Sequence, residues 1–227
     1  MNKFIKLTAL ILFCMSSGLN LFAQEGAFIG ARIIPQTTWI LNNDDFDNPN
    51  VDLKYTWGVA FAVAGGYNFN AKHGIEIQTL YSNQSQQYVD ENNNKVATKN
   101  NIYYKIPLLY RFRTEGKLGS ILTVGPQFGF LSRSDIDNHG VGSNVDDARN
   151  FYENFELSIA LGFGASWMLS EKVSLDLMLK LDYGVTEIES GLGKAFFYDH
   201  NNDGRGATNN ATGGFSVGVN YFFGSAE

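Results

Sequence analysis

Apolar and polar residues alternate with a period of two along much of this chain, which is the pattern of β-strands whose two faces meet different surroundings. In residues 102–112, every even position is Ile, Leu, Tyr or Phe, and the odd positions include Lys105 and Arg111. In residues 55–67, bulky residues alternate with a second face made mostly of Gly and Ala. Eight such runs predict strands: 27–35, 55–69, 74–82, 102–112, 118–131, 155–167, 173–183 and 215–223.

The connections between these runs alternate in length. Short polar turns are expected near 70–73, 114–117 and 170–172. Long stretches rich in Asn, Asp, Ser and Gly separate the other runs, at 36–54, 83–101, 132–154 and 186–213. A compact soluble domain rarely needs four such loops, whereas an outer-membrane barrel has short periplasmic turns and long outer loops. With both termini periplasmic, an even strand count would place all four long loops outside.

The alternation leaves open which face of the strands points outward. A soluble ligand-binding barrel turns its bulky apolar side chains inward, and a membrane barrel turns them toward lipid. The other face carries mainly Gly, Ala and Ser, which suits the narrow lumen of eight strands, whereas a soluble exterior would carry many more charges. We therefore predict an all-β fold, an eight-stranded antiparallel up-and-down transmembrane β-barrel.

The charges on the small face are balanced, with four of each sign, which predicts a neutralising network inside the barrel. Its members are Arg32, Lys105, Arg111 and Lys180 with Glu76, Glu156, Asp176 and Asp182. Ion pairing, rather than acid/base catalysis, is the expected role of Glu76 and Glu156. Aromatic residues near the strand ends predict interfacial girdles. Pro107 and Pro126 are expected to mark bulges, because proline cannot donate a hydrogen bond to a strand ladder.

The N-terminus has the layout of a secretory signal peptide. Lys3 and Lys6 precede an apolar stretch at 7–15, and Ser16, Ser17 and Gly18 lead to a stretch that ends at Ala23. The apolar stretch is short for a transmembrane helix, so an uncleaved anchor helix is the less favoured alternative. We expect a signal peptide over 1–23 and one barrel domain over 24–227. The single cysteine, Cys14, would be removed, which excludes disulfides and thiolate metal sites from the mature chain.

The charge balance argues against nucleic-acid binding. The formal net charge is −6, and no long basic run is present to neutralise phosphates. The three histidines, His73, His139 and His200, fall in an expected turn and two expected loops. No Gly-x-Ser-x-Gly elbow is present. We therefore expect a protein that is not an enzyme.

One loop resembles the start of a calcium-binding loop. Asp199, Asn201 and Asp203 alternate before Gly204, and oxygen ligands at alternating positions can wrap a hard cation. Asn210 stands where the twelfth position of such a loop needs a carboxylate. A weak Ca²⁺ site is one interpretation, and a solvated loop tip is the other. Two further acidic clusters are expected to be solvated: Asp44, Asp45 and Asp47, and Asp146 with Asp147.

Three segments resemble the PorT-like outer-membrane β-barrel family of Bacteroidetes. They are Tyr-Tyr-Lys-Ile-Pro-Leu-Leu-Tyr at 103–110, Gly-Pro-Gln-Phe-Gly-Phe-Leu at 125–131, and Leu-Asp-Tyr-Gly-Val-Thr-Glu-Ile at 181–188. The resemblance implies insertion into the outer membrane, and some members of that family assist protein secretion. It brings no active-site pattern. Residues 218–223 are similar to the aromatic final strand that the barrel assembly machinery reads, although 224–227 follow it.

These observations predict a non-catalytic outer-membrane barrel with no cofactor. Its four long loops would contact an unknown extracellular or envelope protein partner, or the barrel would have a structural role in the envelope. Loops on a rigid scaffold are common places for recognition. The alternatives are a narrow, porin-like pore for small solutes or ions, and an accessory factor in protein secretion.

Overall fold

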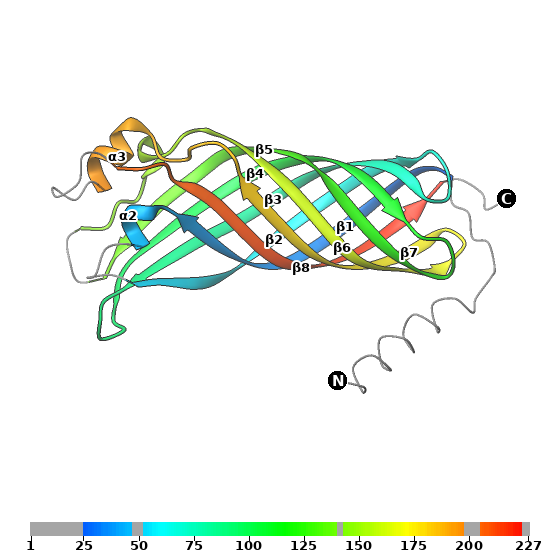
Figure 1. Cartoon of the computed structure of the whole chain (residues 1–227), viewed down its shortest axis with the longest axis horizontal. Helices are drawn as coiled ribbons and strands as arrows, with labels where there is room; N and C mark the ends of the chain where they lie inside the picture. The colour runs from blue at the N-terminus through cyan, green and yellow to red at the C-terminus, as the bar shows by residue number, and fades with distance from the viewer. Residues whose placement is uncertain (1–24, 47–51, 140–142, 198–204, 224–227) are drawn as a thin grey trace.

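A computed structural model describes residues 25–46, 52–139, 143–197 and 205–223. Within these ranges eight antiparallel strands pair in chain order, and the last pairs with the first to close a barrel (Figure 1). The predicted eight-stranded antiparallel barrel is confirmed. The predicted signal peptide, 1–23, lies outside the described residues. The strands are β1 (Gly26–Leu41), β2 (Asp52–Asn68), β3 (His73–Val89), β4 (Lys95–Arg113), β5 (Leu118–Asn138), β6 (Phe155–Ser170), β7 (Val173–Gly184) and β8 (Asn209–Phe222).

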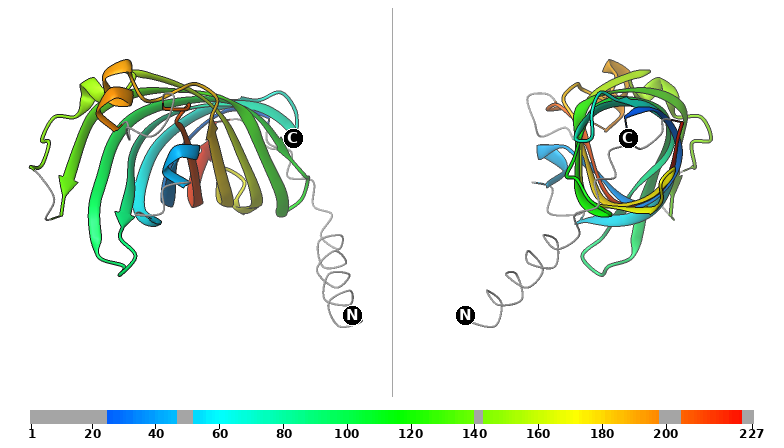
Figure 2. Two further views of the ribbon diagram at one scale, coloured as in Figure 1. Left: turned by 60° about the vertical axis from the view of Figure 1, so that its left-hand side comes forward. Right: turned by 90° about the vertical axis from the view of Figure 1, so that its right-hand side faces the viewer.

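The two ends of the barrel differ in their connections. At one end, which we call the turn end, β1 begins, β8 ends and three short turns join the remaining strands. At the other, the loop end, lie α2 (Asn43–Phe46), the 3-10 helix η1 (Arg149–Phe151) and α3 (Gly191–Phe197). Figure 2 shows the strands as a closed ring when viewed along the barrel. None of the helices in the described ranges is long and apolar enough to cross a membrane.

The bulky apolar side chains point outward. On β2, Trp57 is 73% and Phe61 53% exposed, while Ala60 and Ala62 between and beside them are buried. The aromatic residues predicted for the girdles are exposed, apart from the half-buried Phe112; they are Tyr55, Trp57, Tyr67, Phe69, Tyr110, Trp167, Tyr183, Tyr221 and Phe223. Because hydrocarbon is the surrounding that favours such an exterior, the orientation suits a membrane barrel.

The strands run further toward the loop end than the sequence predicted. The expected loop at 83–101 is wrong, because β3 and β4 continue through it and only five residues, 90–94, connect them. Gln84 and Gln86 are polar because they face the lumen, where they are buried. Polar residues likewise led the sequence analysis to place the last residues of β1 and β5 and the first residues of β8 in loops. Three longer connections remain at the loop end: 42–51, 139–154 and 185–208.

The two prolines sit in the ladder without bulges. Pro107 pairs with Gln127 and Pro126 with Ile159, and the pairing keeps its register past both. The predicted bulges are therefore wrong at these positions. On β4 and β5 the shift falls between Ile102 and Tyr103 instead. A Cβ atom on Gly125 would lie 2.0 Å from the backbone oxygen of Leu108, so a glycine is needed where β4 approaches β5 beside Pro126.

Candidate functional site

Four charged side chains from four strands meet inside the barrel. We call Arg32 (β1), Glu76 (β3), Arg111 (β4) and Asp176 (β7) the luminal quartet. Arg32 Nη2 donates to both carboxylate oxygens of Glu76, at 2.7 and 2.6 Å, and Arg111 Nη2 donates to Asp176 Oδ2 at 3.0 Å. The pairs also contact each other, since Arg32 lies 4.0 Å from Asp176 and Arg111 lies 3.7 Å from Glu76. Two positive and two negative charges thus neutralise one another away from water.

An amide completes the quartet. Arg32 Nη1 donates to Asn220 Oδ1 at 3.0 Å, and Asn220 Nδ2 donates to Asp176 Oδ2 at 2.8 Å. A buried charge is stable only when it is paired and hydrogen-bonded. The cluster therefore fastens β1, β3, β4, β7 and β8 to one another across the lumen. Glu76 and Asp176 are each held by an arginine side chain.

The other four predicted luminal residues form two separate pairs. Lys105 Nζ lies 3.3 Å from Glu156 Oε1, and Asn210 Nδ2 donates to Glu156 Oε2 at 3.0 Å. Lys180 Nζ lies 4.0 Å from Asp182 Oδ1. All eight predicted side chains are buried in the barrel. The structure thus divides them into one quartet and two pairs, a division that the alternation of the sequence does not specify.

Packed side chains and small cavities lie inside the barrel. Two cavities among the luminal charges have volumes of about 10 Å³ each, which is room for about one water molecule apiece. Toward the turn end, Phe28, Phe222 and Met168 form an apolar cluster, and the Phe28 and Phe222 rings lie 5.4 Å apart. The Arg111 guanidinium lies 5.0 Å from the Phe28 ring. Packed side chains therefore obstruct the lumen at this level.

Sequence reasoning missed one luminal arginine. Arg113 is buried at the end of β4, where its Nε donates to Ser166 Oγ at 3.2 Å and its Nη2 to the Gly116 backbone oxygen at 2.8 Å. The signal was present, because Arg113 continues the odd-numbered series of Lys105 and Arg111. The expected strand ended one residue too early to include it.

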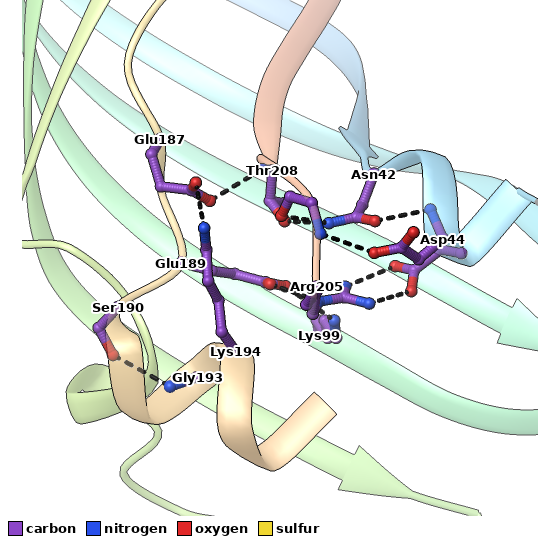
Figure 3. A network of polar contacts seen from close by, with 12 residues as sticks. Asn42, Asp44, Lys99, Glu187, Glu189, Ser190, Gly193, Lys194, Arg205 and Thr208 are labelled. Carbon is purple, nitrogen blue, oxygen red and sulfur yellow. Dashed lines mark hydrogen bonds and ion pairs between the residues drawn. The ribbon is translucent and has the colours of Figure 1, made fainter. Parts of the chain in front are cut away.

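A second network of four charges lies at the loop end (Figure 3). We call Asp45, Lys99, Glu189 and Arg205 the loop-end network. Arg205 donates to both oxygens of Asp45, at 2.7 and 3.0 Å, and to both oxygens of Glu189, at 2.6 and 3.0 Å. Lys99 Nζ lies 3.7 Å from Glu189 Oε1 and 3.6 Å from the centre of the Phe197 ring. One arginine therefore joins α2 to the 185–208 connection, and Lys99 joins that connection to the barrel wall.

The electrostatics of the Asp45–Arg205 pair favour its charged form. Burial alone would raise the pKa of the Asp45 carboxyl, but hydrogen bonds from Arg205 and the nearby charge of Lys99 outweigh it and lower the pKa. Burial would likewise lower the pKa of Arg205, but its hydrogen bonds to Glu189 and Asp45 raise it. Burial raises the pKa of Tyr152, which keeps this neighbouring hydroxyl protonated. Asp45 and Arg205 are thus both held in their charged forms at neutral pH.

Further hydrogen bonds hold the same connections together. Asn42 Nδ2 donates to Thr208 Oγ1 at 2.7 Å, and Lys194 Nζ lies 2.7 Å from Glu187 Oε2 (Figure 3). The Gly193 backbone N–H donates to Ser190 Oγ at 3.1 Å, which caps the start of α3. The Ser190 hydroxyl donates in turn to the Asn150 backbone oxygen at 2.6 Å. The 185–208 connection is therefore fastened to both β1 and η1.

The predicted acidic clusters have different outcomes. Asp45 was expected to be solvated, and this is wrong, because its carboxylate binds Arg205 and accepts a hydrogen bond from the Tyr88 hydroxyl at 3.1 Å. Asp44 accepts a hydrogen bond from the Gly206 N–H at 2.7 Å, and Asp47 lies outside the described residues. Asp147 is exposed and pairs with Arg149 at 2.8 Å. Its hydrogen bond from Arg149 lowers the pKa of Asp147 to about 2.

The predicted calcium ligands, Asp199, Asn201 and Asp203, lie outside the described residues. Within the described ranges, no group of three or more Asp, Glu, His or Cys side chains could hold a metal ion. His73 contacts the Tyr110 hydroxyl, and His139 Nε2 lies 3.0 Å from Thr98 Oγ1. Neither histidine has a carboxylate partner among the residues that the structure describes.

Comparisons with known proteins agree with this architecture. The family model for the outer membrane protein beta-barrel domain matches residues 10–223. The chain belongs to this family. Family membership implies an outer-membrane location. No curated protein matches the sequence.

Several solved structures are similar to this chain. Neisserial surface protein A has a TM-score of 0.50 and 15% identity, over 88% of this chain and 99% of that one. The outer membrane protein OprG from Pseudomonas aeruginosa has a TM-score of 0.49 and 12% identity, over 91% and 100% of the two chains. Ail, the attachment invasion locus protein of Yersinia pestis, has a TM-score of 0.47 and 13% identity, over 88% and 99%. At these identities the likeness to Neisserial surface protein A shows the fold alone.

Proposed function

We propose that this chain is a non-catalytic outer-membrane barrel that presents a fixed surface at its loop end to an extracellular or envelope protein partner. The observation that carries the proposal is the loop-end network, in which Arg205 joins Asp45 and Glu189 through four hydrogen bonds. Such bidentate pairs hold their partners in one geometry. Export through the signal peptide at 1–23 and folding by the barrel assembly machinery would place this end outside the cell.

The contact surface proposed for the partner is an apolar patch on α3. Leu192 and Phe196 are 66% and 53% exposed, and the Phe196 ring stacks on Phe151 with centroids 4.4 Å apart. Exposed aromatic residues on a rigid support are typical anchors of protein interfaces. The patch follows directly after Ser190 and Glu189, which fix the start of α3, so its position depends on the loop-end network.

Photo-cross-linking in cells tests this role. A photoreactive residue at Phe196 should give one defined protein adduct, and the same residue at Asp147, also exposed at the loop end, should not. The adduct should weaken in Glu189→Gln, because release of the network moves α3. Equal adducts at both positions, or none at Phe196, would contradict the proposal.

A narrow pore is the principal alternative. The luminal quartet and the apolar cluster of Phe28, Phe222 and Met168 argue against it, because their packed side chains lie across the lumen. Planar-bilayer recordings separate the two functions. We expect no reproducible conductance from the wild-type barrel, whereas a steady ion current would favour the pore.

A role in protein secretion rests on the resemblance of 103–110 and 125–131 to the PorT-like family. The segments lie on β4 and β5, where a Cβ atom on Gly125 would collide with the backbone oxygen of Leu108. Membership in that narrower family is therefore proposed from strand sequence, not from a functional residue. Deletion of the gene followed by measurement of secreted protein tests it, and unchanged secretion would remove this alternative.

A further inference from the structure

A groove of about 410 Å³ crosses the outer surface of the barrel near the loop end. Its walls are Trp39 on β1, Tyr183 and Leu181 on β7, and Ile159 on β6. Ala211 on β8 forms part of its floor. Its volume falls in the range of small-molecule pockets, about 300–1,000 Å³. The groove is separate from the lumen and from the loop-end network, so neither accounts for it.

The pairing of β8 with its two neighbours explains the groove. Ala211 lies between its pairing partners Trp39 and Tyr183, and Gly213 pairs with Leu181. A Cβ atom on Gly213 would lie 3.4 Å from the Trp39 ring and 3.5 Å from Leu181 Cδ2. Large side chains on β1 and β7 thus flank β8, which carries only Ala211 and Gly213 on its outer face at this level. Glycine within a strand weakens it and often marks a place that another group approaches closely.

We propose that this groove seats one acyl chain of a lipid in the outer leaflet of the membrane. The groove lies within the exposed apolar belt of a chain that belongs to an outer-membrane family, so hydrocarbon is its immediate surrounding. Trp39 and Tyr183 lie at the loop end, where interfacial aromatic residues are expected, and this end faces outward if the short turns are periplasmic. A chain lying over Ala211 would contact Trp39 on one side and Tyr183 on the other, which increases dispersion contacts over those on a convex barrel surface.

Quenching of tryptophan fluorescence tests whether an acyl chain binds in the groove. The chain has three tryptophans, Trp39, Trp57 and Trp167, so variants that keep only Trp39 or only Trp57 can be compared. Each is reconstituted into phosphatidylcholine vesicles whose acyl chains carry bromine. Ordinary lipid contact would follow exposure, and Trp57 is 73% exposed against 36% for Trp39. A seated chain predicts that Trp39 is quenched at least as strongly as Trp57 despite its smaller exposure.

A matched pair of substitutions locates the effect. Ala211→Leu fills the groove from its floor, and Gly65→Leu adds a leucine side chain to an open position on β2, where a Cβ atom has its nearest neighbour at 4.0 Å. We expect Ala211→Leu to remove the excess quenching of Trp39, and Gly65→Leu to leave it unchanged. Folding of each variant is checked by the heat-dependent shift in gel migration.

Three outcomes would overturn the proposal. Trp39 quenching could be weaker than that of Trp57 in proportion to exposure, or it could be unaffected by Ala211→Leu. Trp39 could also be shielded from brominated lipid while the barrels cross-link to one another through this face, which would assign the groove to a second copy of the chain. The test does not involve the loop partner, so its failure leaves the proposed function standing.

Discussion

The luminal quartet and the loop-end network have the same composition, two basic and two acidic side chains, but different supports. Every member of the quartet is on a strand, and the register of the barrel fixes its position. In the loop-end network only Lys99 is on a strand, while Glu189 and Arg205 lie in one long connection and Asp45 lies in another. The quartet therefore contributes to the stability of the barrel, and the loop-end network contributes to the order of the connections. Equal charges thus have different consequences because different backbone segments hold them.

The largest expected effect is on the quartet. Arg32→Met leaves Glu76 and Asp176 buried with one arginine between them, and should lower the free energy of unfolding by about 3–5 kcal/mol. Denaturant titration of the reconstituted barrel, followed by gel migration without heating, measures this. Arg32→Met combined with Glu76→Met should recover most of the loss, because Arg111 and Asp176 remain paired at 3.0 Å. If the double variant were as unstable as the single one, charge pairing would not be the cause.

The corresponding change at the loop end should leave the barrel intact. Glu189→Gln removes a carboxylate that binds Arg205 and lies 3.7 Å from Lys99. Hydrogen bonds to charged groups contribute about 1.5–3 kcal/mol each, and the loss should be confined to the connections. We expect faster hydrogen exchange and proteolysis over 185–208, with an unchanged denaturation midpoint for the strands. A lowered midpoint would show that the two networks are not independent.

Acid should also weaken the contact between α2 and the 185–208 connection. The pKa of Asp45 is lower in the folded protein than its ordinary value of 3.8, so its stabilising effect is complete above 3.8 and is lost as the pH falls through the lowered pKa. Protonated Asp45 no longer pairs with Arg205. Protection of the 42–46 and 205–208 amides from hydrogen exchange, relative to the intrinsic exchange rate at each pH, should therefore fall at strongly acidic pH and stay high near neutrality. Asp45→Asn should show the reduced protection at both pH values.

The sequence predicted the strands and the luminal residues, because both follow from one local rule, the alternation of side chains along a strand. It predicted neither how far most strands continue toward the loop end nor the loop-end network. The sequence analysis placed Gln84 and Gln86 in a loop, because polar side chains are equally suited to a polar lumen and to water. Asp45 and Arg205 are 160 residues apart, and no periodicity links them. Only the closed barrel brings their two connections together.

The smallest effect is expected from an exposed ion pair outside both networks. It tests whether charge pairing alone orders the loop end. Asp147 and Arg149 are 2.8 Å apart, but both side chains are more than half exposed. Exposed ion pairs contribute little to stability, because water stabilises each separate charge almost as well as the ion pair does. Asp147→Asn should therefore change neither the exchange of 185–208 nor the denaturation midpoint, although it removes a charge-assisted pair as short as that between Arg205 and Asp45. A response to Asp147→Asn as large as that to Glu189→Gln would mean that total charge, and not burial between two connections, orders the loop end.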